Sequence, residues 1–217
     1  MRAEFWLKKW EDAETGFHQD QVHPLLVRHW PALERGPGCR VLVPLCGKSV
    51  DMVYLAGLDH AVTGIELSAL AICQFFAEQG LDPETSARAG FRVHAAGALR
   101  LIEGDFFALE TGLVGPVDAV YDRAALIAMP PERQTDYVRQ LEPLAATAPI
   151  LLVTLDYDPA EMQGPPFATP PAQVERLFDE RYRIHCLARQ DALADNPGLA
   201  RRGLTGLSET VWHLRPR

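Results

Sequence analysis

Residues 40–52 read Arg-Val-Leu-Val-Pro-Leu-Cys-Gly-Lys-Ser-Val-Asp-Met, and this stretch decides the fold class. The apolar run at 41–43 is typical of a short parallel strand that is buried on both faces. Pro44 ends the strand because it cannot donate a ladder hydrogen bond, and Gly47 allows a tight turn. A helix is expected to start at about Ser49. A strand, a glycine turn and a helix in this order predict a ligand crevice at the carboxyl end of the strand.

The turn at Gly47 matches neither of the common nucleotide-binding loops. A Walker loop needs a glycine five positions earlier, where this chain has Leu42. The dinucleotide fingerprint Gly-x-Gly-x-x-Gly is also missing from the turn, which disfavours an NAD(P)-dependent dehydrogenase. A single glycine suits a ligand that has no pyrophosphate, such as S-adenosylmethionine.

A carboxylate follows at the distance that nucleoside binding requires. A second strand is expected from Ala61 to Ile65, and it ends at Glu66, the 19th residue after Gly47. This spacing is typical of an acidic residue that binds ribose hydroxyls, because its two acceptor oxygens face two adjacent hydroxyls. The alternative is a solvent-exposed glutamate at a strand end. Ser68 is expected to cap the helix that follows.

Two further strand ends carry candidate residues. A third strand at 99–103 leads into Gly104-Asp105-Phe106-Phe107, where an acid and an aromatic can bracket an adenine, one by hydrogen bonding and the other by stacking. The alternative is a turn aspartate beside core phenylalanines. A fourth strand at 117–121 ends just before Arg123, where side chains of such folds face the reacting groups. The alternative for Arg123 is a surface ion pair, which contributes little to stability.

The remaining sequence continues the alternation of strands and helices. A helix from Pro130, a fifth strand at 149–155, a helix at 173–178 and two last strands at 182–187 and 210–214 are expected. Residues 81–97 look like an excursion that holds a short strand at 91–94. We therefore predict one domain, 1–217, of the α/β class: a doubly wound, mostly parallel seven-stranded sheet with an antiparallel edge strand.

An aromatic segment precedes this sheet. Phe5, Trp6, Trp10 and Phe17 alternate with charged residues. A helix with a buried apolar stripe is then expected from Asp20. Residues 1–35 are predicted to form a helical and aromatic cover, in which residues 1–20 either pack statically on the domain or close over a ligand as a lid.

Composition disfavours several classes of partner and of cellular location. A chain of 217 residues that is 47% hydrophobic can bury a core of its own, and its net charge of −8 disfavours a nucleic-acid partner. No apolar run is long enough to span a membrane, and the N-terminus is not a signal peptide, so a cytoplasmic protein is expected.

The cysteines at 39, 46, 73 and 186 show no metal-ligand spacing and predict reduced, buried thiols without a metal. Cys46 is interpreted as a small residue beside a ligand rather than a nucleophile.

Taken together, these motifs resemble those of the bacterial thiopurine S-methyltransferase family. The resemblance covers nearly the whole chain and rests on Phe5-Trp6, Trp10, Pro44-Leu45-Cys46-Gly47-Lys48-Ser49 with Asp51-Met52, Gly64-Ile65-Glu66-Leu67-Ser68, Gly104-Asp105-Phe106-Phe107 and Tyr121-Asp122-Arg123-Ala124-Ala125-Leu126. The Pro-Leu-Cys-Gly-Lys-Ser string followed by the Glu-Leu-Ser string is specific to that family. It implies the class I methyltransferase fold.

The resemblance also implies roles for single residues. It implies that S-adenosylmethionine is bound by Trp10, Leu45, Gly47, Glu66, Leu67 and Arg123, with Asp105 and Phe106 beside the adenine. Arg123 would also be the catalytic residue, and it would contact the acceptor together with Phe17. An arginine of the C-terminal part is expected near the substrate, with Arg201 and Arg202 as the two candidates.

The implied acceptor is a small thiol, either a thiopurine or another aromatic or heterocyclic thiol. Transfer of a methyl group to a thiolate removes charge, so a dry pocket favours it. Arg123 near the acceptor would lower the pKa of the thiol, which makes a separate general base unnecessary. Two alternatives remain: a methyltransferase for selenium or tellurium compounds, and a non-catalytic nucleoside-binding domain. We expect the protein to be a monomer.

Overall fold

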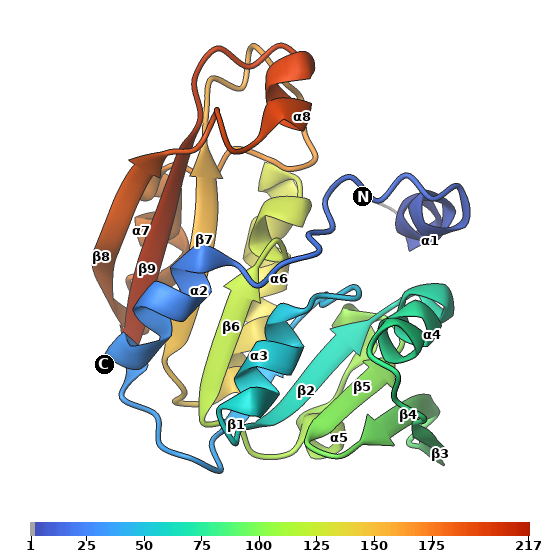
Figure 1. The fold of residues 1–217 in the computed structure, drawn as a ribbon. Coiled ribbons are helices and arrows are strands. Elements are labelled where there is room, and N and C mark those ends of the chain that lie inside the picture. The colour runs from blue at the N-terminus through green and yellow to red at the C-terminus, as the bar shows by residue number, and fades with distance from the viewer. Residues whose placement is uncertain (1–2) are drawn as a thin grey trace.

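The computed structural model describes residues 3–217, which form one sheet with helices on both faces (Figure 1). The strands are β1 (Arg40–Val43), β2 (Ala61–Glu66), β3 (Glu84–Arg88), β4 (Phe91–Ala96), β5 (Leu99–Glu103), β6 (Ala119–Arg123), β7 (Ile150–Asp156), β8 (Tyr182–Asp191) and β9 (Ser208–Pro216). Their order across the sheet is β3-β4-β5-β2-β1-β6-β7-β9-β8.

Helices connect most of these strands. The α-helices are α1 (Ala3–Glu11), α2 (Pro24–His29), α3 (Asp51–Gly57), α4 (Ala69–Glu78), α5 (Thr111–Val114), α6 (Pro131–Ala145), α7 (Pro171–Phe178) and α8 (Pro197–Arg201). Short 3-10 turns form η1 (Trp30–Leu33), η2 (Phe106–Ala108) and η3 (Leu126–Ala128). The apolar side chains of α2, α3 and α4 pack in one core on one face of the sheet, and those of α5, α6 and α7 pack in another.

The predicted doubly wound sheet with an antiparallel edge is confirmed, but the predicted count of seven strands is wrong. The sheet has nine strands, of which β5, β2, β1, β6 and β7 are parallel. Antiparallel pairs flank them on both sides, β4 with β3 on one edge and β9 with β8 on the other. All five residues of β3 are exposed, so its sequence lacks the alternation that predicts a strand. β3 forms because β4 pairs with β5 on one side and leaves its other edge free to form hydrogen bonds with β3.

The central strands confirm the expected burial on both faces. In β1, Val41 and Val43 point into the core under α2, α3 and α4, while Leu42 points into the opposite core. Alternating side chains of a strand point to opposite faces, so an unbroken apolar run is what a strand covered on both sides needs. The prediction from residues 41–43 is therefore confirmed.

The helix boundaries follow local chemistry. Ser68 caps α4 as predicted, because its hydroxyl accepts a hydrogen bond from the Ala71 amide at 3.2 Å. The helix expected from Asp20 begins only at Pro24, which occupies the first turn, where a missing amide hydrogen costs nothing. The predicted apolar stripe is buried across α2 and η1 through Leu25, Leu26, Trp30 and Leu33.

The parallel strands all point to one end of the sheet, where α1 and α8 also lie (Figure 1). The linker between α1 and α2 runs along this end: His23 hydrogen-bonds to Asp51 at the start of α3 and contacts Glu209 in β9. The part of the proposed cover that precedes α2 thus lies at the end of the sheet where ligands bind in open α/β folds, whereas its last residues, 32–35, lie at the opposite end. Met1 and Arg2, also part of that prediction, lie outside the described residues. No helix within 3–217 has the length and apolar character that crossing a membrane requires.

Candidate active site

Two unusual backbone conformations mark the carboxyl ends of neighbouring parallel strands. Leu45 after β1 has φ +47°, and Ala124 after β6 has φ +70°. Positive φ values are costly for residues with a side chain, and such strain gathers at functional sites. β1 lies between β2 and β6, where the order of the strands changes direction. Ligands bind at this switch point in doubly wound sheets.

The glycine turn after β1 is covered by an aromatic side chain. Gly47 has φ +54°, and a Cβ added there would lie 3.2 Å from Cζ2 of Trp10. The indole of Trp10, only 4% exposed, therefore packs directly on the turn. Phe17 sits edge-on against Trp10, with 5.5 Å between ring centroids, and is itself 38% exposed. The structure thus brings two residues of the cover, Trp10 and Phe17, to the switch point.

Glu66 is the buried carboxylate of this crevice. One of its oxygens accepts a hydrogen bond from the Gly47 amide at 2.9 Å, and the other accepts from the Ser68 amide at 2.7 Å. Burial raises the pKa of Glu66, while the amides of Ser68, Gly47 and Leu67 oppose that rise. Its side chain is 7% exposed, which excludes the alternative of a solvent-exposed glutamate. Each oxygen keeps a lone pair that can accept from a ligand hydroxyl.

At the end of β5, the Phe106 ring cannot stack on a ligand, whereas the Asp105 carboxylate can still bind one. Phe106 is 1% exposed and stacks on Tyr137 in the core, with ring centroids 5.1 Å apart. The Phe106 ring is therefore not available to stack on an adenine, because it is already stacked inside the domain. That Phe106 lies beside the adenine stays a prediction. Asp105 accepts a hydrogen bond from the Phe107 amide at 2.9 Å, as a turn aspartate does. Its side chain is exposed, so the second oxygen remains available to a ligand.

Arg123 ends β6 and is half-buried. The neighbouring carboxylate, Asp122, faces the other way: it accepts from the Tyr137 hydroxyl at 2.6 Å and from the Leu126 amide at 3.1 Å. Burial raises the pKa of Asp122 to about 6. The alternative of an Asp122–Arg123 ion pair is thus excluded, and the salt bridges within residues 3–217 do not involve Arg123.

The N-terminal linker is coupled electrostatically to Lys48 and Arg123. The pKa of His18 is lowered mainly by burial, and further by the positive charges of Lys48 and Arg123. Lys48 is itself held by Glu78 at 2.5 Å. His18, Lys48 and Arg123 therefore come from three separate segments and share one electrostatic environment at the carboxyl ends of the strands.

A buried network behind the turn was missed by sequence reasoning. Asp51, 1% exposed, accepts hydrogen bonds from the His23 amide at 2.7 Å and the Tyr121 hydroxyl at 2.9 Å. The His23 ring nitrogen Nε2 lies 3.2 Å from Glu209. Asp51 begins α3, and aspartate in a first helical turn is so common that it gave no signal of a tertiary role.

The cysteines match their prediction in part. Cys46 is buried, its pKa is raised well above the usual value by burial, and its sulfur would lie 2.6 Å from a Cβ at Gly64. Such a thiol is a packing residue rather than a nucleophile. Cys39 is also buried, but Cys73 and Cys186 are exposed, so the expectation that all four are buried is wrong.

The C-terminal arginines lie beside an apolar cluster at the end of β7. Arg202 donates a hydrogen bond to the Pro165 carbonyl at 2.7 Å, and Arg201 is exposed in α8. The cluster consists of buried Ile127, Leu155, Tyr157, Met162, Ala192, Leu204 and Leu207. This cluster lies on the β7 side of the switch point, the side opposite β2.

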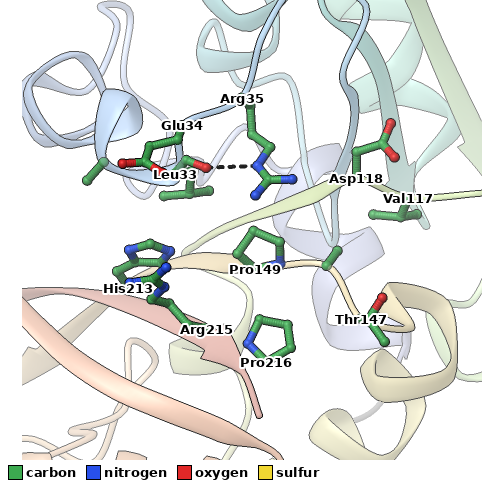
Figure 2. A pocket seen from close by; sticks show the side chains of 12 residues that line it. Leu33, Glu34, Arg35, Val117, Asp118, Thr147, Pro149, His213, Arg215 and Pro216 are labelled. Atoms are coloured by element: carbon green, nitrogen blue, oxygen red, sulfur yellow. Dashed lines mark hydrogen bonds between the residues drawn. The ribbon is translucent and has the colours of Figure 1, made fainter.

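A groove lies at the other end of the sheet. This groove of about 390 Å³ is lined by residues that precede β1, β6 and β7, among them Arg35, Asp118 and Pro149 (Figure 2). These are the amino ends of the parallel strands. The groove therefore lies at the end of the sheet away from Glu66 and Arg123, and it is not the crevice described above.

Known proteins similar to this chain agree with one another. The family described as thiopurine S-methyltransferase matches residues 1–217. Thiopurine S-methyltransferases of Pseudomonas fluorescens and Methylococcus capsulatus are 46% and 48% identical to it. These alignments cover 99% of this chain in both cases, and 99% and 98% of the two relatives.

Solved structures support the fold. A Burkholderia thailandensis 1,6-didemethyltoxoflavin N1-methyltransferase, solved with S-adenosylhomocysteine, superposes with a TM-score of 0.64 at 14% identity, covering 99% of this chain and 86% of that one. An S-adenosylmethionine-dependent methyltransferase from Anabaena variabilis also gives 0.64, at 13% identity, with 99% and 95% covered. The class I methyltransferase fold is thus confirmed. With relatives this similar over their full length, the chain belongs to the thiopurine S-methyltransferase family.

Proposed function

We propose that this protein transfers the methyl group of S-adenosylmethionine to the sulfur of a thiopurine or of another aromatic or heterocyclic thiol. The observation that carries the proposal is the placement of two side chains around the switch point. One is the buried carboxylate of Glu66, and the other is Arg123, a cation without a carboxylate partner in the described part of the chain. The names of the full-length relatives support the same activity.

The residues at the switch point fit the cofactor. S-adenosylmethionine, when bound, supplies a methyl group activated by a sulfonium charge. Glu66 would accept the ribose hydroxyls, since its oxygens are already fixed by backbone amides. Gly47 leaves its face of the turn without a side chain, and Trp10 closes over it. Leu45 and Leu67 would line the same cradle, and Asp105 offers an exposed oxygen beside the adenine.

On the acceptor side, Arg123 would stabilise the ionised form of the thiol. A nearby cation lowers the pKa of an acidic group, so more of the acceptor is present as the reactive thiolate. Phe17 and the apolar cluster at the end of β7 would contact the aromatic ring and exclude water. Loss of charge in the reaction makes a dry site favourable. We further propose a small-molecule acceptor, no nucleic-acid or membrane partner, and a monomer in the cytoplasm.

The test is turnover. The protein is incubated with methyl-labelled S-adenosylmethionine and a side-by-side panel of thiopurines, other aromatic thiols, selenols and metalloid oxyanions. We expect a labelled thioether to form fastest with the aromatic and heterocyclic thiols. Faster methylation of selenium or tellurium compounds would assign the protein to that chemistry. Binding of S-adenosylhomocysteine without any product would identify a non-catalytic nucleoside-binding domain.

Replacing Glu66 with alanine is expected to weaken S-adenosylmethionine binding by about 1–3 kcal/mol, or roughly 5- to 150-fold, since a charged hydrogen-bond acceptor is lost. Calorimetric titration with S-adenosylhomocysteine measures the change. Glu175→Ala is the matched control, because Glu175 is exposed on α7. An unchanged dissociation constant in a folded Glu66→Ala protein would remove ribose binding from the proposal.

Hydrogen exchange tests the N-terminal cover. Without ligand, the amides of residues 3–20 should exchange quickly, because a segment that admits a ligand must open at low free-energy cost. S-adenosylhomocysteine should slow their exchange, since Trp10 packs on the turn that would hold it. The amides of α6 serve as the control and should not change. Equal protection in both states would favour the static-packing interpretation.

A further inference from the structure

The groove at the amino ends of the parallel strands is not used by the proposed methyl transfer. Figure 2 shows the Glu34–Arg35 segment along one wall and His213 and Arg215 of β9 along the other, with Pro149 between them. Its volume of about 390 Å³ lies within the range of small-molecule sites.

Basic side chains gather in this groove and beside it. His213 and Arg215 of β9 lie directly opposite His185 and Arg183 of β8, and opposed residues of antiparallel strands share one face of the sheet. The rings of His185 and His213 are 6.5 Å apart. Together with Arg35 these four residues form what we call the basic cluster. Such a gathering is unexpected in a chain with a net charge of −8.

Most of the nearby carboxylates are already neutralised. Asp118, which also lines the groove, is held by two hydrogen bonds from the Arg40 side chain at 2.7 and 2.6 Å. This contact lowers the pKa of Asp118 to about 2. Other arginines of this end are paired in the same way: Arg181 with Glu142 and Arg217 with Asp179. The salt bridges within residues 3–217 include none of the arginines of the basic cluster. Of the two carboxylates that line the groove, Asp118 is paired with Arg40 and Glu34 is in none of these salt bridges.

The donors of the groove are oriented. Nε of Arg35 donates to the Leu33 carbonyl at 2.8 Å, which fixes the plane of the guanidinium and leaves its terminal nitrogens pointing into the groove (Figure 2). His213 is 8% exposed, and its pKa is lowered by burial and then by Arg215, His185 and Arg35, whereas Glu34 opposes them. A neutral His213 still offers one ring nitrogen as a donor.

We propose that this groove is a second ligand site, which binds a phosphate-type oxyanion between Arg35 and Arg215 with His213 as a third donor. Guanidinium groups bind such oxyanions through two parallel hydrogen bonds, which a single ammonium cannot do. The groove is larger than one phosphate group, so it has room for a small organic substituent. The ligand is therefore inorganic phosphate or a phosphomonoester.

The test uses the full-length protein saturated with S-adenosylhomocysteine, so that the crevice at the other end is filled. Inorganic phosphate and glycerol 3-phosphate are titrated separately while the imidazole signals of His213 are followed by NMR. We expect saturable shifts with both, and competition between them. Tighter binding of glycerol 3-phosphate would assign a phosphomonoester, and equal binding would assign the free anion. No saturable shift of His213 with either probe would overturn the proposal.

Variants distinguish binding of the anion in the groove from diffuse electrostatic attraction to the protein surface. Arg35→Ala and Arg215→Ala should each weaken binding about tenfold or more, while Glu34→Gln should tighten it because a repelling carboxylate is removed. Arg139→Ala, an exposed arginine of α6, is the control and should change nothing. Equal weakening by Arg139→Ala would reveal diffuse attraction and overturn the proposal. Methyl transfer by the Arg35 and Arg215 variants should stay at the wild-type rate, which keeps this test independent of the proposed function.

Discussion

Replacing Arg123 with alanine is expected to lower kcat/KM about 100- to 1000-fold, the loss that follows removal of a charge-stabilising group from a reacting centre. The loss should be largest for acceptor thiols that are least ionised at the pH of the assay. The physical reason is that Arg123 has no carboxylate partner within residues 3–217, since Asp122 is turned toward Tyr137. Its charge is therefore available to lower the pKa of a bound thiol.

The measurement is a pH–rate profile for a series of aromatic thiols of different pKa. In Arg123→Ala, the rise of activity should move to higher pH for each thiol, while thiols that are already ionised should lose less. Arg123→Lys should recover part of the activity, since it restores the charge but not the planar fork. Arg139→Ala is the matched control, because it removes an exposed arginine of α6.

A different result would assign Arg123 to the cofactor alone. In that case the variant would show a raised KM for S-adenosylmethionine and the same loss for every acceptor. A uniform loss across thiols of different pKa would therefore contradict the thiolate role and leave Arg123 as a binding residue.

Replacing Asp51 with alanine is expected to lower the free energy of unfolding by about 2–6 kcal/mol. The substitution leaves two buried donors, the His23 amide and the Tyr121 hydroxyl, without their acceptor, and each such group costs about 1–3 kcal/mol. Urea unfolding measures the change. Asp51→Asn keeps one acceptor oxygen and should lose less.

A double-mutant cycle makes this prediction specific. Tyr121→Phe removes one of the two donors, so Asp51→Ala should cost less in the Tyr121→Phe background than in the wild type. Asp136→Ala, an exposed aspartate of α6, is the control and should unfold at nearly the same urea concentration. Additive costs in the cycle would show that the Asp51–Tyr121 contact contributes nothing to stability.

The cover should respond to the same substitution. Asp51 holds the linker through the His23 amide, so its loss should speed hydrogen exchange in residues 3–20 even in the presence of S-adenosylhomocysteine. Asp51 would then be a positioning residue that connects the linker to the glycine turn. Unchanged exchange in this segment would confine Asp51 to a structural role inside the domain.

Local spacing alone determined much of the fold and part of the candidate site. The apolar run at 41–43, the turn at Gly47 and the cap at Ser68 depend on neighbours within a few residues. The position of Glu66 follows from the fixed lengths of a turn, a helix and a strand. These features are set by backbone geometry and by burial patterns that repeat along the chain, so a sequence is sufficient to predict them.

Only the tertiary structure decided which way several side chains face. Phe106 points into the core because Tyr137, from α6, offers a ring to stack on. Asp51 binds Tyr121, which is 70 residues away in the sequence. β3 exists because β4 provides an edge, although all of its residues are exposed. Such contacts depend on how distant segments of the chain pack together. The pattern of neighbouring residues does not show which distant segment will pack against them.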